Sequence, residues 1–301
     1  MAGSTGQVLT SLVVNLVIAV AKGVAAALTG SGAMLAETIH SFADCANQLL
    51  LLLGIKQAQR PPSASHPLGH GRALYFWSFI VALLLFSGGG VFSIYEGLHK
   101  IRHPEPVGDI TAGLVVLGLA ILLEGYATIG NLREMKARRG QMPLLPYLRA
   151  TKDSDLVVVF GENAAAVTGL VLALGALIMA RTTDDGRWDG AGSLAVGVVL
   201  VAVAIFLAKE IKSLLVGESA APAIEAEVRR IAAATDGIDA VLRVLTIQQG
   251  PGEVVVAMKV KMRPGLATGG ELCAVLNAFE VKLQAAVPEI KWSFVEPDVA
   301  D

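Results

Sequence analysis

Long apolar stretches fill the first 216 residues of the chain, and shorter patterns fill the rest. A membrane-spanning helix needs about 20 mostly apolar residues. Six stretches meet this need: 7–29, 32–58, 73–100, 108–134, 155–181 and 189–215. Residues 217–301 instead alternate in ways typical of a water-exposed domain. We therefore predict an α-helical membrane protein, with a six-helix transmembrane domain at 1–216 and a separate domain at 217–301.

The pattern after residue 217 has both helical and strand periods. Apolar positions recur at helical spacing over 222–235 and 269–287, and strand-like runs cover 240–248, 253–262 and 290–296. In the second strand, apolar side chains from Val254 to Met262 share one face, and Lys259 and Lys261 lie on the other. The order α-β-β-α-β predicts one sheet with helices on one face.

Composition supports the membrane assignment and excludes several functions. Hydrophobic residues make up 54% and charged residues 17%, against about a quarter charged in an average soluble chain. The net charge of −2 argues against a nucleic-acid partner. Cys45 and Cys273 are far apart and have no metal-site spacing. We find no phosphate loop, nucleophile or triad, so we expect no enzymatic activity.

Basic residues favour one orientation. Lys and Arg are frequent after the second, fourth and sixth stretches and rarer in the loops on the opposite side. Since cytoplasmic loops carry the excess of Lys and Arg, we expect both termini in the cytoplasm. The first apolar run lacks a signal-peptide pattern, so we expect it to stay as a membrane segment. Abundant Ala, Val and Gly favour a bacterial inner membrane.

The second stretch carries the main candidate chemistry. Glu37, His40, Asp44 and Asn47 are spaced three, four and three apart, which places them on one face of a helix. Polar groups inside a membrane are costly and mark ion paths. His40 and Asp44 could hold one divalent cation, because imidazole and carboxylate suit zinc and tolerate manganese, cobalt or iron(II). The alternative is a structural His–Asp hydrogen bond.

Other helices offer partners for this face. Glu162 in the fifth stretch is either a carboxylate in contact with water or a third metal oxygen, with Asn163 as a further ligand or a support. Glu124 in the fourth stretch and Lys22 in the first could form a structural ion pair or part of a proton path.

The loop after the second stretch contains His66 and His70, four residues apart among Gly and Pro. Two such histidines could form a compact surface metal site. The alternative is a turn that caps the third helix.

These motifs together resemble the cation diffusion facilitator family of metal–proton antiporters. The matching segments, in chain order, are Ser31-Gly32, Glu37, residues 40–44, residues 66–71, Asp189-Gly190 with Ser193, and residues 294–297. The resemblance implies a homodimer, six transmembrane helices and a ferredoxin-like cytoplasmic domain. It also implies a tetrahedral metal site built from the second and fifth helices.

Only two of the four ligand positions of that site match in this chain. His40 and Asp44 match, but Val159 and Asn163 stand where zinc-transporting members have His and Asp. The sequence is more similar to the branch that includes the mitochondrial zinc exporter, through segments such as His40-Ser41 and Asn47-Gln48. That branch makes Glu162 the best candidate for the ligand from the fifth helix.

We therefore expect four metal ligands, His40, Asp44, Glu162 and Asn163, and three ion-path residues, Glu37, Asn47 and Glu124. The expected function is secondary export of a divalent cation, zinc first, by proton antiport, with no prosthetic group. The partners would be a second copy of the chain, the bilayer, the metal and protons. The alternatives are a transport-inactive scaffold or partner subunit, or a transporter selective for manganese, cobalt or iron(II).

The C-terminal region has no His, because all five lie in the first 103 residues. Its only candidate ligands are Glu271, Cys273, Glu296 and Asp298, and we interpret each as a surface residue. We expect a dimerisation module more than a metal sensor.

Overall fold

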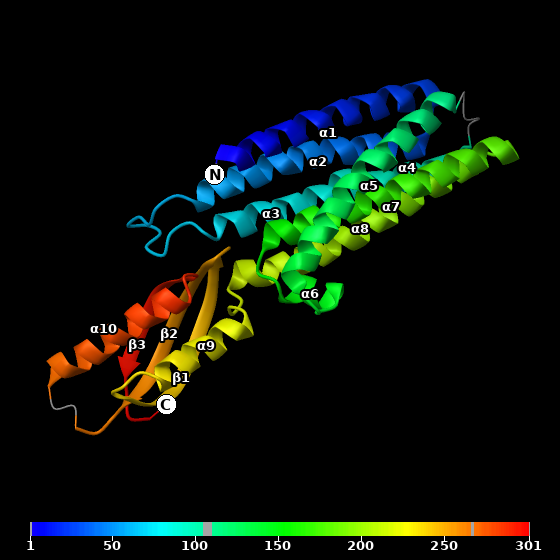
Figure 1. Cartoon of the computed structure of the whole chain (residues 1–301). Coiled ribbons are helices and arrows are strands. Elements are labelled where there is room, and N and C mark those ends of the chain that lie inside the picture. Colours follow the sequence, from blue (N-terminus) through cyan, green and yellow to red (C-terminus); the bar gives the residue numbers. More distant parts are fainter. Residues whose placement is uncertain (1, 105–109, 266–267, 301) are drawn as a thin grey trace. The chain divides into compact units, whose positions relative to one another are not determined.

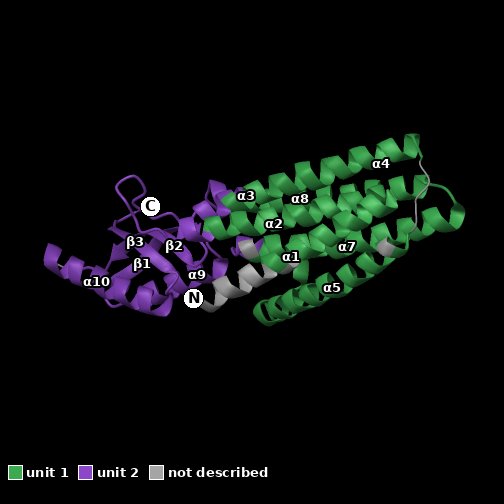
Figure 2. Cartoon of the chain, turned by 90° about the horizontal axis from the view of Figure 1, so that it is seen from above, with its two compact units in different colours: residues 1–54, 77–148, 155–211 green, residues 55–76, 149–154, 212–301 purple. Residues whose placement is uncertain are grey.

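The structure is a computed structural model. It describes the backbone of residues 2–104, 110–265 and 268–300, and their side chains apart from 2–11, 14, 112 and 155. The chain forms two compact units, shown in different colours in Figure 2. One comprises 1–54, 77–148 and 155–211, and the other comprises 55–76, 149–154 and 212–301. The domain boundary predicted at residue 216 stays a prediction.

The first unit is built from long helices that lie lengthwise beside one another (Figures 1 and 2). Its helices, some of which run on into the second unit, are α1 (Ala2–Thr29), α2 (Gly32–Ala58), α3 (Ala73–Leu84), the π-helix η1 (Leu85–Val91), α4 (Phe92–Arg102), α5 (Thr111–Arg139), α6 (Leu144–Ala150), α7 (Ser154–Thr183) and α8 (Arg187–Val216). Helices therefore cover the six predicted stretches, except that residues 108 and 109 lie outside the described residues and α5 begins only at Thr111.

Four described segments are long and apolar enough to cross a bilayer: Ala73–Arg102, Gly113–Arg139, Leu156–Thr183 and Arg187–Val216. The described apolar part of α1, Asn15–Thr29, is shorter. Helix α2 carries Glu37 and Asp44 in its interior, which lowers its hydropathy. The count of six spans stays a prediction.

Glycines let α8 approach the α3–α4 run at backbone distance. A Cβ on Gly197 would lie 2.7 Å from the Ile94 nitrogen, and one on Gly190 would lie 2.9 Å from the Gly97 carbonyl oxygen. Small residues at such contacts favour helix association in membranes. Gly190 and Gly197 are therefore packing positions between α8 and the α3–α4 run.

The second unit contains a three-stranded sheet with the order β1-β2-β3. Strands β1 (Ile238–Gly250) and β2 (Glu253–Met262) are antiparallel, and β3 (Ile290–Pro297) runs parallel to β2. Helices α9 (Pro222–Ala233) and α10 (Gly269–Ala286) complete the predicted α-β-β-α-β order. Three strands are one fewer than the full ferredoxin-like β-α-β-β-α-β pattern, so only the order of the elements matches that pattern, from its first helix onward.

The core of this second unit is apolar. Val254, Val256, Met258 and Val260 of β2 are buried, as the alternation predicted. They pack with side chains from both helices, including the fully buried Phe279 of α10. Helix α10 begins with a capping box, in which Thr268 accepts from the Glu271 backbone and the Glu271 carboxylate accepts from the Thr268 N–H.

Candidate metal centre

The polar face of α2 is largely hidden from solvent. Glu37, His40 and Asn47 have no exposed surface, and the Asp44 side chain is 18% exposed. Their spacing follows the helical repeat, so consecutive members stack along one side of α2. The helix therefore carries a stripe of four polar groups, Glu37, His40, Asp44 and Asn47, which we call the α2 stripe.

His40 and Asp44 face each other without a hydrogen bond. The distance from His40 Nε2 to Asp44 Oδ2 is 3.5 Å. Neither ring nitrogen of His40 has a hydrogen-bond partner among the described residues, and Asp44 Oδ1 has none either. The structural alternative, a His–Asp hydrogen bond, is therefore absent from this structure. Two unpaired ligand atoms on adjacent turns of a helix suit a cation better than they suit a packed core.

A cavity of about 550 Å³ lies beside the stripe. Its lining includes Asp44 of α2 and, from α7, Val159, Glu162 and Asn163. Glu162 is 8% exposed, and its Oε1 accepts a hydrogen bond of 2.6 Å from Asn47 Nδ2. This bond joins α2 to α7, the two helices from which a site was expected. His40 is not part of the cavity lining.

The proposed ligands are not arranged around one common metal position. In the part of the chain that the structure describes, no three His, Cys, Asp or Glu side chains form a metal-ligand group. The cavity is nevertheless rich in acceptors. Buried oxygens without a hydrogen-bond partner among the described residues include Asp44 Oδ1, Gln48 Oε1, Glu124 Oε2 and Asn131 Oδ1, and these four residues all line the cavity. Oxygens in such excess over donors can be satisfied by a cation or by water.

A second polar cluster fixes the start of α2. The Asp189 carboxylate, in the first turn of α8, accepts from Gly32 N at 2.6 Å, Ala33 N at 3.3 Å and Ser31 Oγ at 2.5 Å. Lys100 Nζ at the end of α4 pairs with the same carboxylate at 3.2 Å and also donates to the Gly30 carbonyl. Asp189 thus acts as an N-cap supplied by another helix, which satisfies amides that α2 cannot pair itself.

Lys22 and Glu124 form the ion pair that the sequence suggested as one alternative. Lys22 Nζ lies 3.0 Å from Glu124 Oε1 and 3.3 Å from Glu37 Oε2. Through these contacts α1 and α5 join the α2 stripe.

The loop before α3 brings its two histidines together. The rings of His66 and His70 have centroids 4.3 Å apart, and His66 Nδ1 lies 3.0 Å from Ser65 Oγ. The same loop also leads into α3, because the His70 carbonyl accepts from Ala73 N at 2.8 Å. The loop thus has the turn that one alternative requires, and the paired rings that the other requires.

The C-terminal candidate ligands have other roles. Glu271 belongs to the capping box of α10, and Lys259 pairs with Asp298 at 2.8 Å and with Glu296 at 4.0 Å. Cys273 is exposed, and both cysteines of the chain are free. Glu271, Glu296 and Asp298 therefore have protein partners, and the interpretation of all four as surface residues stays a prediction.

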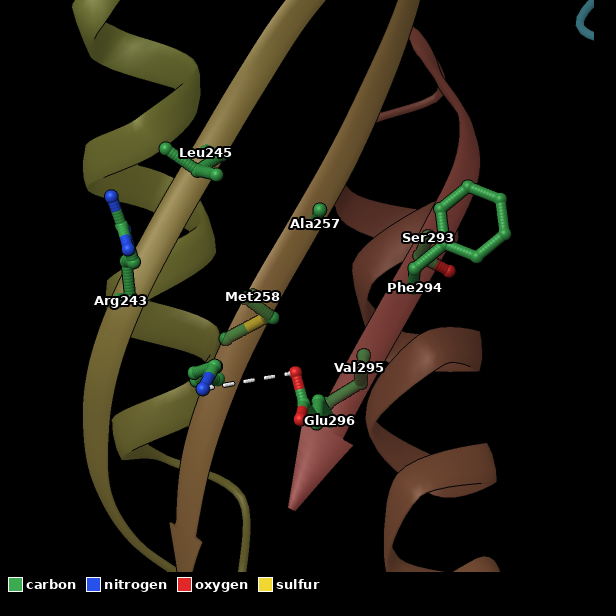
Figure 3. A pocket seen from close by; sticks show the side chains of 9 residues that line it. Arg243, Leu245, Ala257, Met258, Ser293, Phe294, Val295 and Glu296 are labelled. Atoms are coloured by element: carbon green, nitrogen blue, oxygen red, sulfur yellow. Dashed lines mark ion pairs between the residues drawn. The ribbon is translucent and has the colours of Figure 1, made fainter. Parts of the chain in front are cut away.

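A second cavity, of about 470 Å³, lies over the sheet (Figure 3). It is lined by residues of all three strands, and the dashed line in Figure 3 marks the pair of Lys259 with Glu296. Its other charged residue is Arg243. Two cations against one carboxylate make this cavity a poor place for a metal ion.

Comparison with known proteins identifies the membrane unit. Residues 8–216 match the model of the cation efflux transmembrane domain. The chain belongs to the cation efflux family. It is a multi-pass integral membrane protein, and the family resemblance read from its motifs is confirmed.

Individual relatives place the chain near one branch of the cation efflux family. It is 34% identical over 196 residues to the proton-coupled zinc antiporter SLC30A9, mitochondrial, of Xenopus laevis, which covers 64% of this chain and 35% of that protein. It is 33% identical over 193 residues to metal tolerance protein C4 of Arabidopsis thaliana, covering 64% and 42%. The magnetosome protein MamM of Paramagnetospirillum magneticum is 28% identical over 123 residues, covering 38% of each chain.

The aligned regions therefore span well under half the length of these curated relatives. The similarity to the branch with the mitochondrial zinc exporter is confirmed.

Some site residues were not singled out from the sequence of this cation efflux family member. Ser41 and Gln48 line the cavity, but the sequence pointed to them only as parts of the segments that carry the branch resemblance. Asp189 was noted only as part of a motif, and its partners at residues 31–33 are far away in sequence. An acid directly before a long apolar run was the available hint.

Proposed function

We propose that this chain is a secondary transporter that exports a divalent cation, zinc first, in exchange for protons. The observation that supports it most is the oxygen-rich cavity that α1, α2, α5 and α7 line in the matched cation efflux domain, with Asp44, Glu162 and Asn163 in its lining. The names of the SLC30A9 relatives include proton-coupled zinc antiport. The proposal transfers that activity to this chain.

The proposed metal ligands are His40, Asp44, Glu162 and Asn163, with Glu37, Asn47 and Glu124 along the ion path. Binding would require a small inward movement of α7 against α2, since the present arrangement holds no closed ligand group among the described residues. Metal ligands must be deprotonated before they coordinate. Arrival of the cation would therefore release protons, and arrival of protons would release the cation, which couples the two flows.

Zinc is the first choice of cargo, because one imidazole with carboxylates is within its usual ligand set. Three oxygen ligands against one nitrogen make the site less selective than one with two histidines. Manganese, cobalt and iron(II) are therefore included in the test. A second station at His66 and His70 could collect metal at the loop, since their rings are already adjacent.

We further propose the wider organisation implied by the family. The chain would form a homodimer with six spans, and the domain at 217–301 would be a ferredoxin-like cytoplasmic dimerisation module. Both termini would face the cytoplasm, in a bacterial inner membrane. The transported cation would be its only metal, without a prosthetic group or an enzymatic reaction.

The test is metal flux into proteoliposomes that contain the full chain, under an imposed pH gradient. We expect zinc flux that collapses when the gradient is dissipated. Asp44→Ala and His40→Ala should each reduce the flux at least about a hundredfold, and Glu162→Gln about tenfold or more. Glu210→Gln, which removes a carboxylate of α8 outside the cavity lining, is the matched control and should transport like the parent. Flux that persists in Asp44→Ala would reject the assigned site.

One observation favours a second candidate, a transport-inactive scaffold or partner subunit. Val159 lines the cavity where zinc-transporting members carry a ligand, and the described ligands do not converge. Absence of flux for all four metals, from folded protein in a tight vesicle, would favour this candidate.

A further inference from the structure

The buried lysine of α1 has an unusual set of partners. Lys22 has no exposed surface. Its ammonium donates to Ser41 Oγ at 2.8 Å, Glu124 Oε1 at 3.0 Å and Glu37 Oε2 at 3.3 Å. An ammonium has three protons, so each can serve one partner. Lys22 thereby connects α1, α2 and α5 at the level of the α2 stripe.

Such a cluster is an expensive way to hold helices together. Each buried ion loses several kcal/mol of hydration, and well-packed apolar residues often give equal or better stability. Intramembrane ions usually mark functional positions for the same reason. The arrangement therefore calls for a role that apolar side chains could not perform.

Glu124 shows what that role is. Its Oε1 accepts from Lys22, while its Oε2 is buried and has no hydrogen-bond partner among the described residues. Glu124 also lines the cavity that contains Asp44 and Glu162. One carboxylate thus belongs to two environments, with one oxygen fixed by the ammonium and the other unpaired.

Glu37 provides an internal contrast. It also pairs with Lys22 and has an unpaired oxygen, Oε1, but it does not line the cavity. That oxygen lies against Gly169 of α7, where a Cβ would collide with it. Glu37 therefore pairs with the lysine outside the cavity lining, and Glu124 is the acid that reaches the cavity.

We propose that Glu124 supplies a carboxylate oxygen to the cation from α5, and that Lys22 is the positioning residue that holds this carboxylate in place. This inference rests on the transport function proposed above. Asn131 and Gln48 line the same cavity with unpaired amide oxygens. Carboxylate and amide oxygens together suit a divalent ion that keeps part of its water shell. Glu124 thus adds a third helix to a site expected from α2 and α7 alone.

The experiment measures zinc binding by calorimetry on the purified full chain, metal-free thermal unfolding, and zinc flux in proteoliposomes. Glu124→Gln keeps the shape of the side chain and removes its charge. We expect its zinc Kd and transport KM to rise about tenfold or more. Lys22→Met should raise both to a similar extent, and Lys22→Arg, which keeps a cation, should stay within about threefold of the parent.

Lys22→Met alone leaves Glu37 buried without its counter-ion and could fail to fold. The double variant Lys22→Met/Glu37→Gln removes both charges and keeps Glu124. We expect it to recover the thermal midpoint of the parent while its zinc Kd stays about tenfold raised. A structural role for Lys22 would make stability and affinity recover together.

The outcomes separate this inference from the proposed function. If Glu124→Gln transports and binds zinc as the parent does, the proposed role of Glu124 is overturned and the proposed transport function stands. Recovery of both stability and affinity in the double variant overturns the positioning role of Lys22. Absence of zinc binding and flux in the parent overturns the transporter and this inference with it. A raised Kd in Glu124→Gln, with Glu210→Gln at the parent value, supports the inference.

Discussion

The α2 stripe and the core of the C-terminal sheet are both buried, but the stripe is polar and the core is apolar. The sheet core consists of apolar side chains packed from two helices and three strands. The α2 stripe holds Glu37, His40, Asp44 and Asn47, and each has at least one oxygen or nitrogen without a hydrogen-bond partner among the described residues. One region is optimised for stability. The other keeps unsatisfied groups, which is typical of functional sites that sacrifice stability.

The sharpest test of this contrast is a deletion in the apolar core. Phe279→Ala removes a fully buried ring from α10 and should destabilise the C-terminal domain by about 3 to 5 kcal/mol. Hydrogen exchange of the β2 amides in the full-length protein should accelerate about a hundredfold or more. Val281→Ala, on the same helix at a side chain that is 68% exposed, is the control. Similar exchange in both variants would contradict a core centred on Phe279.

A substitution in the α2 stripe should have the opposite effect and stabilise the metal-free protein. His40→Leu replaces a fully buried ring with two unpaired nitrogens by an apolar side chain of similar size. Each buried unsatisfied group costs about 1 to 3 kcal/mol, so metal-free protein should be stabilised by about that amount. The measurement is the thermal midpoint in detergent, with and without zinc.

Zinc should raise the thermal midpoint of the parent and leave that of His40→Leu unchanged, because a ligand stabilises only a protein that binds it. His99→Leu, at an exposed position of α4, should change stability by no more than about 0.5 kcal/mol. A destabilised His40→Leu would show that the ring is satisfied by a group such as water.

The smallest effect concerns an acid near the sheet that, like the acids of the α2 stripe, has an oxygen without a partner among the described residues. Glu253 at the start of β2 has a buried Oε2 without a partner among the described residues. Burial raises its pKa above the usual 4.5, although the charge of Lys291 opposes the shift. The folded state therefore binds a proton more tightly than the unfolded state does. Stability contributed by this group falls as pH rises from about 4.5 through the raised pKa.

Glu253→Gln should remove this pH dependence and stabilise the domain at neutral pH by about 1 kcal/mol or less. Denaturant unfolding of the full chain with Trp77→Phe and Trp188→Phe, which leaves Trp292 as its tryptophan, is followed by fluorescence between pH 4.5 and 8. A parent curve that is flat over this range would contradict the assigned burial. Glu289→Gln, an exposed acid nearby, should follow the parent.

Local sequence patterns predicted much of this fold. Apolar runs located the helices, and strict alternation identified β2. The helical repeat also placed the polar residues of α2 on one side. These features depend on neighbours within a few residues, where spacing and propensity are sufficient.

Features that depend on distant partners were harder to predict. The three-way contact of Lys22 joins residues up to 102 positions apart, and the sequence suggested only a pair. The π-helix η1 has no local signature beyond three glycines, Gly88 to Gly90. The hydrogen bond between Asn47 and Glu162 depends on the relative register of α2 and α7. The periodicity within each helix does not determine that register.

The Asp189 cap has a consequence for biogenesis. The amide groups that begin α2 find their acceptor in α8, 157 residues later. During synthesis from the N-terminus, α2 must therefore form with these amides solvated or bound to something else. Only after α8 has been synthesised can Asp189 replace that temporary partner. Completion of the helix that carries His40 and Asp44 is thus one of the last steps in assembling the membrane domain.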